Sequence, residues 1–298
     1  MADLEGNLDA KQYAPETPLA TFTHAVRGAS NLDWGMQHRL ARVLNPDTGR
    51  TVMLAFDHGY FQGPTRGLER IDLNIAPLEN QADALMATRG ALRTSIPPST
   101  SAGLVLRASG GPSILKDLSD EYTAMAMRDA VRIGADAVAV QVFIGGEHES
   151  RSVRNLTTLV DEGYDAGIPV LGVTAVGKEL TRDSRYLGLA TRIIAELGAQ
   201  LVKTYYCEEG FDEVVAGCPV PVIMAGGKKL PELDALTMAS RAVRAGAAGV
   251  DMGRNIFQSA HPAAMLTAVR AVVHDDADPA DAHEIFREAT AGSGGASS

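Results

Sequence analysis

Lys203 is the residue of this chain whose surroundings point most directly to covalent chemistry. It lies inside the apolar run Leu201–Tyr205, where a long charged side chain has no evident access to water. A buried ammonium group is unfavourable unless it is paired or neutral, and burial lowers the pKa of a lysine. A neutral amine condenses with a ketone to give an imine, the Schiff base of lysine enzymes. The other interpretation is a structural lysine that reaches the surface or pairs with Asp57, and position alone leaves both open.

Asp57 and His58 directly follow another apolar run, Val52–Phe56. Imidazole titrates near neutral pH, so His58 is a candidate proton donor or acceptor. Asp57 is a candidate to hold Lys203 protonated until substrate arrives, or to relay a proton. The alternative is that one of these two side chains only anchors its loop.

Two glycine-rich turns with basic residues indicate a phosphate site. The segment AGGKK contains Gly226, Gly227 and Lys228, and the segment MGRN contains Gly253 and Arg254. Backbone N–H groups at the start of a helix bind anions, and glycine lets the backbone approach them closely. One glycine pair is more often a simple turn, but two such turns in matching places favour a phosphate cradle.

Other reactive residue types give weaker signals. Neither HxH nor HExxH spacing occurs, so we predict no metal site, and we interpret His148, with Glu147 and Glu149, as the start of a solvated helix. Cys207 has no assignable His or Asn to activate it, so we interpret it as a bystander.

Eight short apolar segments would bring these side chains to one place. They are Val52–Phe56, Ala84–Ala87, Leu104–Arg107, Ala137–Val142, Val170–Thr174, Leu201–Tyr205, Val220–Ala225 and Gly249–Met252. The segments are continuous or β-branched, which is typical of parallel strands buried on both faces. Active sites of α/β barrels lie at the C-terminal ends of the strands, where the reactive residues of this chain also stand.

Helical patterns separate the strand segments. Their apolar positions include Ala124, Met127, Ala130 and Val131 in one pattern and Leu189, Ile193, Ile194 and Leu197 in another. Several patterns end at a glycine that precedes a strand, namely Gly134, Gly167, Gly198 and Gly246. Eight repeats of strand and helix predict an α/β fold of the (β/α)8 TIM barrel type with an N-terminal extension.

Length and charge limit the remaining choices. A chain of 298 residues fits one barrel, so we expect an N-terminal arm over 1–30, a catalytic barrel over 31–290 and a flexible tail over 291–298. The net charge of -10 argues against nucleic acid and anionic membranes as partners. Two cysteines form no disulfide framework, and no long apolar run or basic signal sequence is evident. These features predict a cytoplasmic protein.

From about Leu32 to His274 the chain resembles the DeoC/FbaB family of Schiff-base aldolases. The resemblance rests on LVKTYYCEEGF, AGCPVPVIMAGGKKLPE, GVDMGRNIFQSAHP and NLDWGMQHRLARVLNPDTGRTVMLAFDHGYFQGPTRGLERID. The last stretch favours the thiolase branch of the family, which processes autoinducer-2. The resemblance implies a Schiff base at Lys203, phosphate binding by the loops after strands 7 and 8, and a ring-shaped homo-oligomer, a decamer.

The thiolase branch implies coenzyme A as co-substrate and no bound cofactor. Lys203 would form its imine with a phosphorylated diketone, coenzyme A would take the acetyl group, and His58 or Asp57 would protonate the remaining carbon. The alternative is a class I aldolase acting on a sugar phosphate, but the segment Leu171–Gly177 lacks the acid/base tyrosine that related aldolases carry there. A barrel that binds a phosphosugar without catalysis is a third hypothesis, which the buried Lys203 disfavours.

Overall fold

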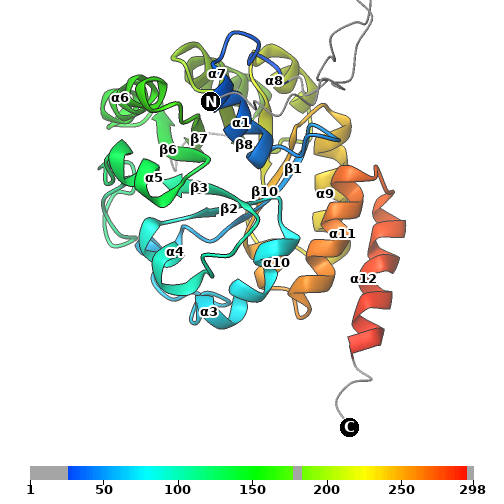
Figure 1. Cartoon of the computed structure of the whole chain (residues 1–298). Helices are drawn as coiled ribbons and strands as arrows, with labels where there is room; N and C mark the ends of the chain where they lie inside the picture. Colours follow the sequence, from blue (N-terminus) through cyan, green and yellow to red (C-terminus); the bar gives the residue numbers. More distant parts are fainter. Residues whose placement is uncertain (1–25, 177–182, 294–298) are drawn as a thin grey trace, which may run out of the picture.

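Eight parallel strands close into a barrel in the computed structural model, which describes residues 26–176 and 183–293 (Figure 1). The strands are β1 (Thr51–Ala55), β2 (Ala84–Ala87), β3 (Gly103–Arg107), β6 (Ala137–Ile144), β7 (Val170–Val176), β8 (Leu201–Tyr205), β9 (Val222–Ala225) and β10 (Gly249–Met252). Their order around the barrel is β1-β10-β9-β8-β7-β6-β3-β2. The predicted (β/α)8 barrel is therefore confirmed.

Helices connect the strands and surround the barrel (Figure 1). They are α1 (Trp34–Val43), α2 (Gly59–Gln62), α3 (Ile71–Asn74), the 3-10 helix η1 (Ala76–Gln81), α4 (Arg89–Ser95), α5 (Met127–Ile133), α6 (Glu149–Ala166), α7 (Ser184–Glu196), α8 (Phe211–Gly217), α9 (Glu232–Arg244), α10 (Arg254–Phe257), α11 (Pro262–His274) and α12 (Pro279–Ser293). After β3 the chain forms a short antiparallel hairpin of β4 (Ser109–Gly110) and β5 (Tyr122–Thr123).

Side chains of each barrel strand alternate between the interior and the outer layer, as the period of two requires. In β1, Met53 belongs to the interior cluster, whereas Val52 and Leu54 pack in the layer between strands and helices. Leu40 and Val43 of α1 join the interior cluster. Since α1 precedes β1, it covers the N-terminal end of the barrel and leaves the C-terminal strand ends for the active site.

The predicted strand segments match the barrel closely. Three of the eight have the predicted bounds, and the others differ by one or two residues at one or both ends. The four predicted helix-ending glycines, Gly134, Gly167, Gly198 and Gly246, all have positive φ. A left-handed residue at these positions ends a helix and turns the chain toward the next strand.

The predicted buried faces of two helices are partly wrong. In α7, Leu189 is 55% exposed, whereas Ala190, Thr191 and Ile194 are buried. Helix α7 packs so closely on β7 that a Cβ at Gly172 would lie 2.2 Å from the Ile194 side chain. Because α7 lies so close to β7, the helix face that carries the small residues Ala190 and Thr191 is the buried one. Likewise Val131 of α5 is 50% exposed, and Ala124 precedes that helix.

The proposed extensions are only partly described. Residues 1–25 of the expected arm lie outside the described residues, whereas Arg27 donates hydrogen bonds to the backbone oxygens of Val215 and Ala216. Helix α12 runs to Ser293, so the first three residues of the expected tail are helical, and 294–298 lie outside the described residues. No helix within the described ranges is long and apolar enough to span a membrane.

Candidate active site

A cavity of about 1110 Å³ opens among the C-terminal ends of the barrel strands. Seven of the eight predicted site residues line it: Asp57, His58, Lys203, Gly226, Gly227, Gly253 and Arg254. The eighth, Lys228, is exposed and is not among the residues that line the cavity. The structure therefore brings the predicted amine and the predicted phosphate turns into one space.

Lys203 is enclosed and paired with Asp251. Its Nζ lies 2.7 Å from Oδ2 of Asp251 and 3.5 Å from Sδ of Met86. The Lys203 side chain is 12% exposed and that of Asp251 is fully buried. The suggested pairing of Lys203 with Asp57 was wrong, since Asp57 forms its ion pair with Arg107.

The expected direction of the Lys203 pKa shift was also wrong. Burial by itself lowers the pKa of this amine, but the negative charges of Asp251 and Asp57 outweigh burial and raise it. Burial raises the pKa of the Asp251 carboxyl to about 6, although the Lys203 charge acts in the opposite direction. A carboxylate with this pKa, in contact with an ammonium group, is placed to accept its proton.

Arg107 organises a second charged group in the same cavity. Its guanidinium lies 2.7 Å from Oδ2 of Asp57 and also contacts Glu121 and Gln141. Burial opposes ionisation of Asp57, but Arg107 and Lys203 hold the pKa of this carboxyl below its usual value. Asp57 is therefore an ionised side chain held in a fixed position.

His58 lines the cavity and stacks on Phe257, with ring centroids 5.7 Å apart. Burial lowers the pKa of His58, and the positive charges of Arg254 and Lys203 add to this effect, while Asp57 opposes it. Nε2 of His58 is buried and has no hydrogen-bond partner within the described part of the chain. The ring is thus a neutral imidazole with an unused nitrogen.

The two glycine turns lie side by side and are tied together by Asn255. Its side chain accepts a hydrogen bond from the Leu230 backbone and donates one to the carbonyl of Gly226. A Cβ at Gly253 would lie 2.2 Å from the backbone oxygen of Ala55, and a Cβ at Gly226 would lie 2.8 Å from Cγ of Met252. Close packing therefore favours glycine at Gly226 and Gly253, and the positive φ of Gly227 favours glycine there.

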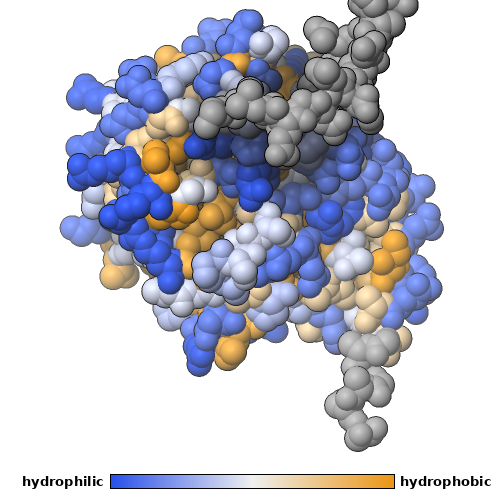
Figure 2. Space-filling view, in the orientation of Figure 1, coloured by the Kyte–Doolittle hydropathy of each residue, from blue (hydrophilic) through white to orange (hydrophobic). Residues whose placement is uncertain are grey.

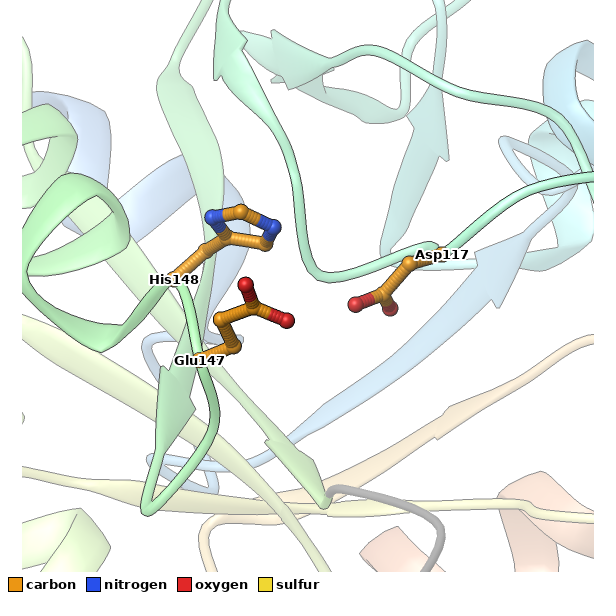
Figure 3. Close-up of side chains that lie close together, drawn as sticks. All are labelled: Asp117, Glu147 and His148. Carbon is orange, nitrogen blue, oxygen red and sulfur yellow. The ribbon is translucent and has the colours of Figure 1, made fainter.

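An acidic group stands at the rim of the cavity. Asp117 precedes β5, and Glu147 and His148 precede α6; one ligand atom from each lies within 4.8 Å of the others (Figure 3). Such a set could hold a divalent cation. Asp117 is far from the other two residues in the sequence, so no sequence motif predicted the group. His148 is the N-cap residue of α6, which confirms the predicted helix start at this position. The two carboxylates are exposed and line the cavity, so they give this side of the rim a negative charge.

Sequence reasoning missed Asp251, Glu121 and the role of Arg107. Asp251 is a carboxylate inside the otherwise apolar strand Gly249–Met252, and this position could have identified it as a site residue in the same way that it identified Lys203. Glu121 lies beside a two-residue strand in a hairpin with no periodic pattern. The Cys207 thiol is buried, and burial raises its pKa, which agrees with a bystander role.

Comparisons with known proteins agree with this geometry. The chain is 57% identical to the 3-hydroxy-5-phosphonooxypentane-2,4-dione thiolase of Escherichia coli (strain K12), over 96% of this chain and 98% of the relative. It is 58% identical to the same-named protein of Enterobacter sp. (strain 638), over 99% and 100%. An archaeal fructose 1,6-bisphosphate aldolase has a similar structure, with a TM-score of 0.73 and 25% identity over 80% of this chain and 99% of that one. The profile of the DeoC/LacD family aldolases matches residues 51–259. The chain belongs to the DeoC/LacD aldolase family.

Proposed function

We propose that this protein is a Schiff-base thiolase that transfers the acetyl group of 3-hydroxy-5-phosphonooxypentane-2,4-dione to coenzyme A. The products are acetyl-CoA and dihydroxyacetone phosphate, in the degradation of autoinducer-2. The observation that carries the proposal is the enclosed amine of Lys203, 2.7 Å from Asp251 and in the same cavity as both glycine turns. The choice of substrate is supported by a relative with this substrate in its name that is 57% identical over nearly the whole chain.

The first step is imine formation at C4 of the dione. The Lys203 ammonium gives its proton to Asp251, and the neutral amine then attacks the C4 ketone with loss of water. The backbone N–H groups near Gly226, Gly227 and Gly253, together with Arg254, bind the substrate phosphate next to that carbon. Since the amine and the anion site share one cavity, the substrate is held at both ends of its C4–C5 segment.

The second step is carbon–carbon cleavage. The thiolate of coenzyme A attacks the C2 carbonyl, the C2–C3 bond breaks, and its electron pair moves through C3 into the protonated imine. Acetyl-CoA leaves, and an enamine stays on Lys203. Protonation at C3 and hydrolysis of the imine release dihydroxyacetone phosphate and restore the amine.

Between the two candidate proton donors, the environment favours His58. Asp57 is held ionised by Arg107, and an ionised carboxylate has no proton to give. The unused Nε2 of His58 and its lowered pKa suit a group that takes a proton from the thiol and returns one to C3. Lys228 contributes no contact to the cavity, so Arg254 is the proposed side-chain cation for the phosphate.

Two measurements test the function. Borohydride reduction with the dione should attach a mass adduct to Lys203, and Lys203→Ala should fold normally, form no adduct and lose turnover. Cleavage of the dione should require coenzyme A. Full-rate cleavage without the thiol would instead support the alternative, a class I aldolase that passes through the same enamine. Absence of an adduct would support a binding protein without catalysis.

Location and assembly are part of the proposal. Soluble phosphorylated substrates and coenzyme A are found in the cytoplasm, and both cysteines of the chain are free thiols, so we propose a cytoplasmic enzyme. We also propose a homo-oligomer of ring form, a decamer. Trp34 of α1 is a large apolar side chain with 78% exposure, which supports contacts between subunits. Light scattering of the purified protein measures the subunit number.

A further inference from the structure

A second pocket lies outside the barrel, between α4 and α5, and is rich in arginine. Its volume is about 640 Å³, and its wall consists of Arg89, Arg93, Ala126, Arg128, Asp129 and Arg132. On the face shown in Figure 2, strongly hydrophilic side chains gather over the region where Figure 1 places α4 and α5. The active-site cavity contains none of these residues, so the arginine pocket is a separate feature.

The pocket carries an excess of positive charge. Arg89, Arg93 and Arg132 all bind the single carboxylate of Asp129, each at 2.8 Å. Arg128 makes no ion pair within the described ranges. Four guanidinium groups thus face one carboxylate in a chain whose net charge is -10. Each bound guanidinium has further N–H donors, and together they form a site for a doubly or more highly charged anion.

The pocket adjoins the active site through two short segments. Met86, which contacts the amine of Lys203, is three residues before Arg89, so their Cα atoms are at most about 11 Å apart. Arg89 also donates a hydrogen bond to the carbonyl of Ala124, three residues after Glu121 of the cavity wall. An extended ligand could therefore reach from one pocket to the other over the rim.

We propose that the arginine pocket binds the phosphates of coenzyme A, the co-substrate of the proposed function on which this inference rests. Coenzyme A carries a 3′-phosphate and a diphosphate at its nucleotide end, and its thiol is at the end of a flexible arm. Arginine is suited to phosphate through its planar set of donors. The carboxylates of Asp117 and Glu147 line the active-site cavity and not the arginine pocket, so phosphate groups are repelled from the cavity rim and attracted to the arginine pocket.

Substitutions in this pocket can be chosen to preserve the fold. In the double variant Arg93→Gln/Arg128→Gln, the carboxylate of Asp129 keeps its ion pairs with Arg89 and Arg132. The matched control is Arg154→Gln on α6, an exposed arginine outside both pockets. The control removes one positive charge at a position that lines neither pocket, whereas the double variant removes two.

The kinetic test compares two thiols, coenzyme A and pantetheine, which lacks the nucleotide phosphates. The double variant should raise the ratio of the KM for coenzyme A to the KM for pantetheine about tenfold or more, since each lost charge-assisted bond weakens binding by about that factor. The control should leave this ratio unchanged. An unchanged ratio in the double variant would overturn the proposal.

A binding test needs no turnover and separates this inference from the proposed function. Titration calorimetry with adenosine 3′,5′-bisphosphate should show binding to the native protein that weakens with salt and falls about tenfold or more in the double variant. If coenzyme A does not support turnover but this arginine-dependent binding is observed, the proposed function fails and the anion site stands. Equal binding by the native protein and the double variant overturns the site. Equal binding with a changed molecular mass in light scattering would show that the pocket is a contact between copies of the chain.

Discussion

Replacing Asp251 with Asn tests the assignment of this carboxylate as the proton acceptor of Lys203. The substitution keeps the size and shape of a fully buried side chain and removes its charge. In the native protein, proton acceptance requires an ionised Asp251, whose pKa is about 6. The rate of imine formation should therefore rise with pH through this value. In the variant no carboxylate contacts Nζ, so the rise near pH 6 should disappear.

The size of the effect follows from the geometry of the pair. Two unit charges 2.7 Å apart interact by about 6 kcal/mol at an effective dielectric constant of about 20. Loss of this attraction removes the main cause that raises the pKa of Lys203 against its burial. Loss of a positioned base slows a proton transfer by roughly 100-fold or more, so we expect imine formation at pH 7 to slow by about that factor.

The assay is borohydride trapping of the imine across a pH series, with the adduct on Lys203 measured by mass spectrometry. Asp83→Asn is the matched control, since Asp83 is also a nearly buried carboxylate, paired with Arg270 and His274 away from the active-site cavity. The control should keep the native pH dependence. A variant Asp251→Asn that retains the rise near pH 6 would refute the role assigned to this carboxylate.

Three further predictions concern stability. Gly253→Ala would place a Cβ 2.2 Å from the carbonyl oxygen of Ala55, so the free energy of unfolding in urea should fall by roughly 1–3 kcal/mol; an unchanged midpoint would contradict the close packing. Because the folded-state pKa of Asp251 is about 6, above the ordinary 3.8, its protonated form stabilises the fold at low pH and this contribution is lost as pH rises through 6. Urea denaturation at pH values between 3.8 and about 6 should show that the free energy of unfolding falls as pH rises. Asp251→Asn should make this fall with pH less steep. An equally steep fall in the native protein and the variant would contradict the raised pKa of Asp251. Arg107→Met leaves two buried carboxylates without their cation and should cost about 3–5 kcal/mol, measured by thermal or urea unfolding, whereas a loss below about 1 kcal/mol would contradict the buried network.

The barrel could be predicted from the sequence because its strands are buried on both faces. Continuous apolar segments such as Val52–Phe56 and Ala84–Ala87 stand out from the amphipathic helices around them. Turn glycines with positive φ then mark where each helix ends. The same property located Lys203, since a charge inside a buried segment is conspicuous.

The helix faces and loop contacts depended on information that the local sequence does not contain. Helix α7 has apolar residues on two stripes, and the close approach to β7 at Gly172 decided which stripe was buried. Glu121 reaches Arg107 only because the β4–β5 hairpin folds back over the strand ends. Asp117 and Glu147 meet at the rim from two loops whose separation in the sequence carries no pattern.

The partner of each charged residue, however, follows from the order of the strands. In a (β/α)8 barrel, the side chains of one interior layer come from alternate strands. Met86, Lys203 and Asp251 lie on the second, sixth and eighth barrel strands, and Lys203 contacts both of the others. Arg107 lies on the third strand and Asp57 directly follows the first, and they form the other ion pair. Each cation therefore pairs with a carboxylate of its own layer. Arg107 keeps Asp57 ionised, and Asp251 is the carboxylate in contact with Lys203 that can accept its proton.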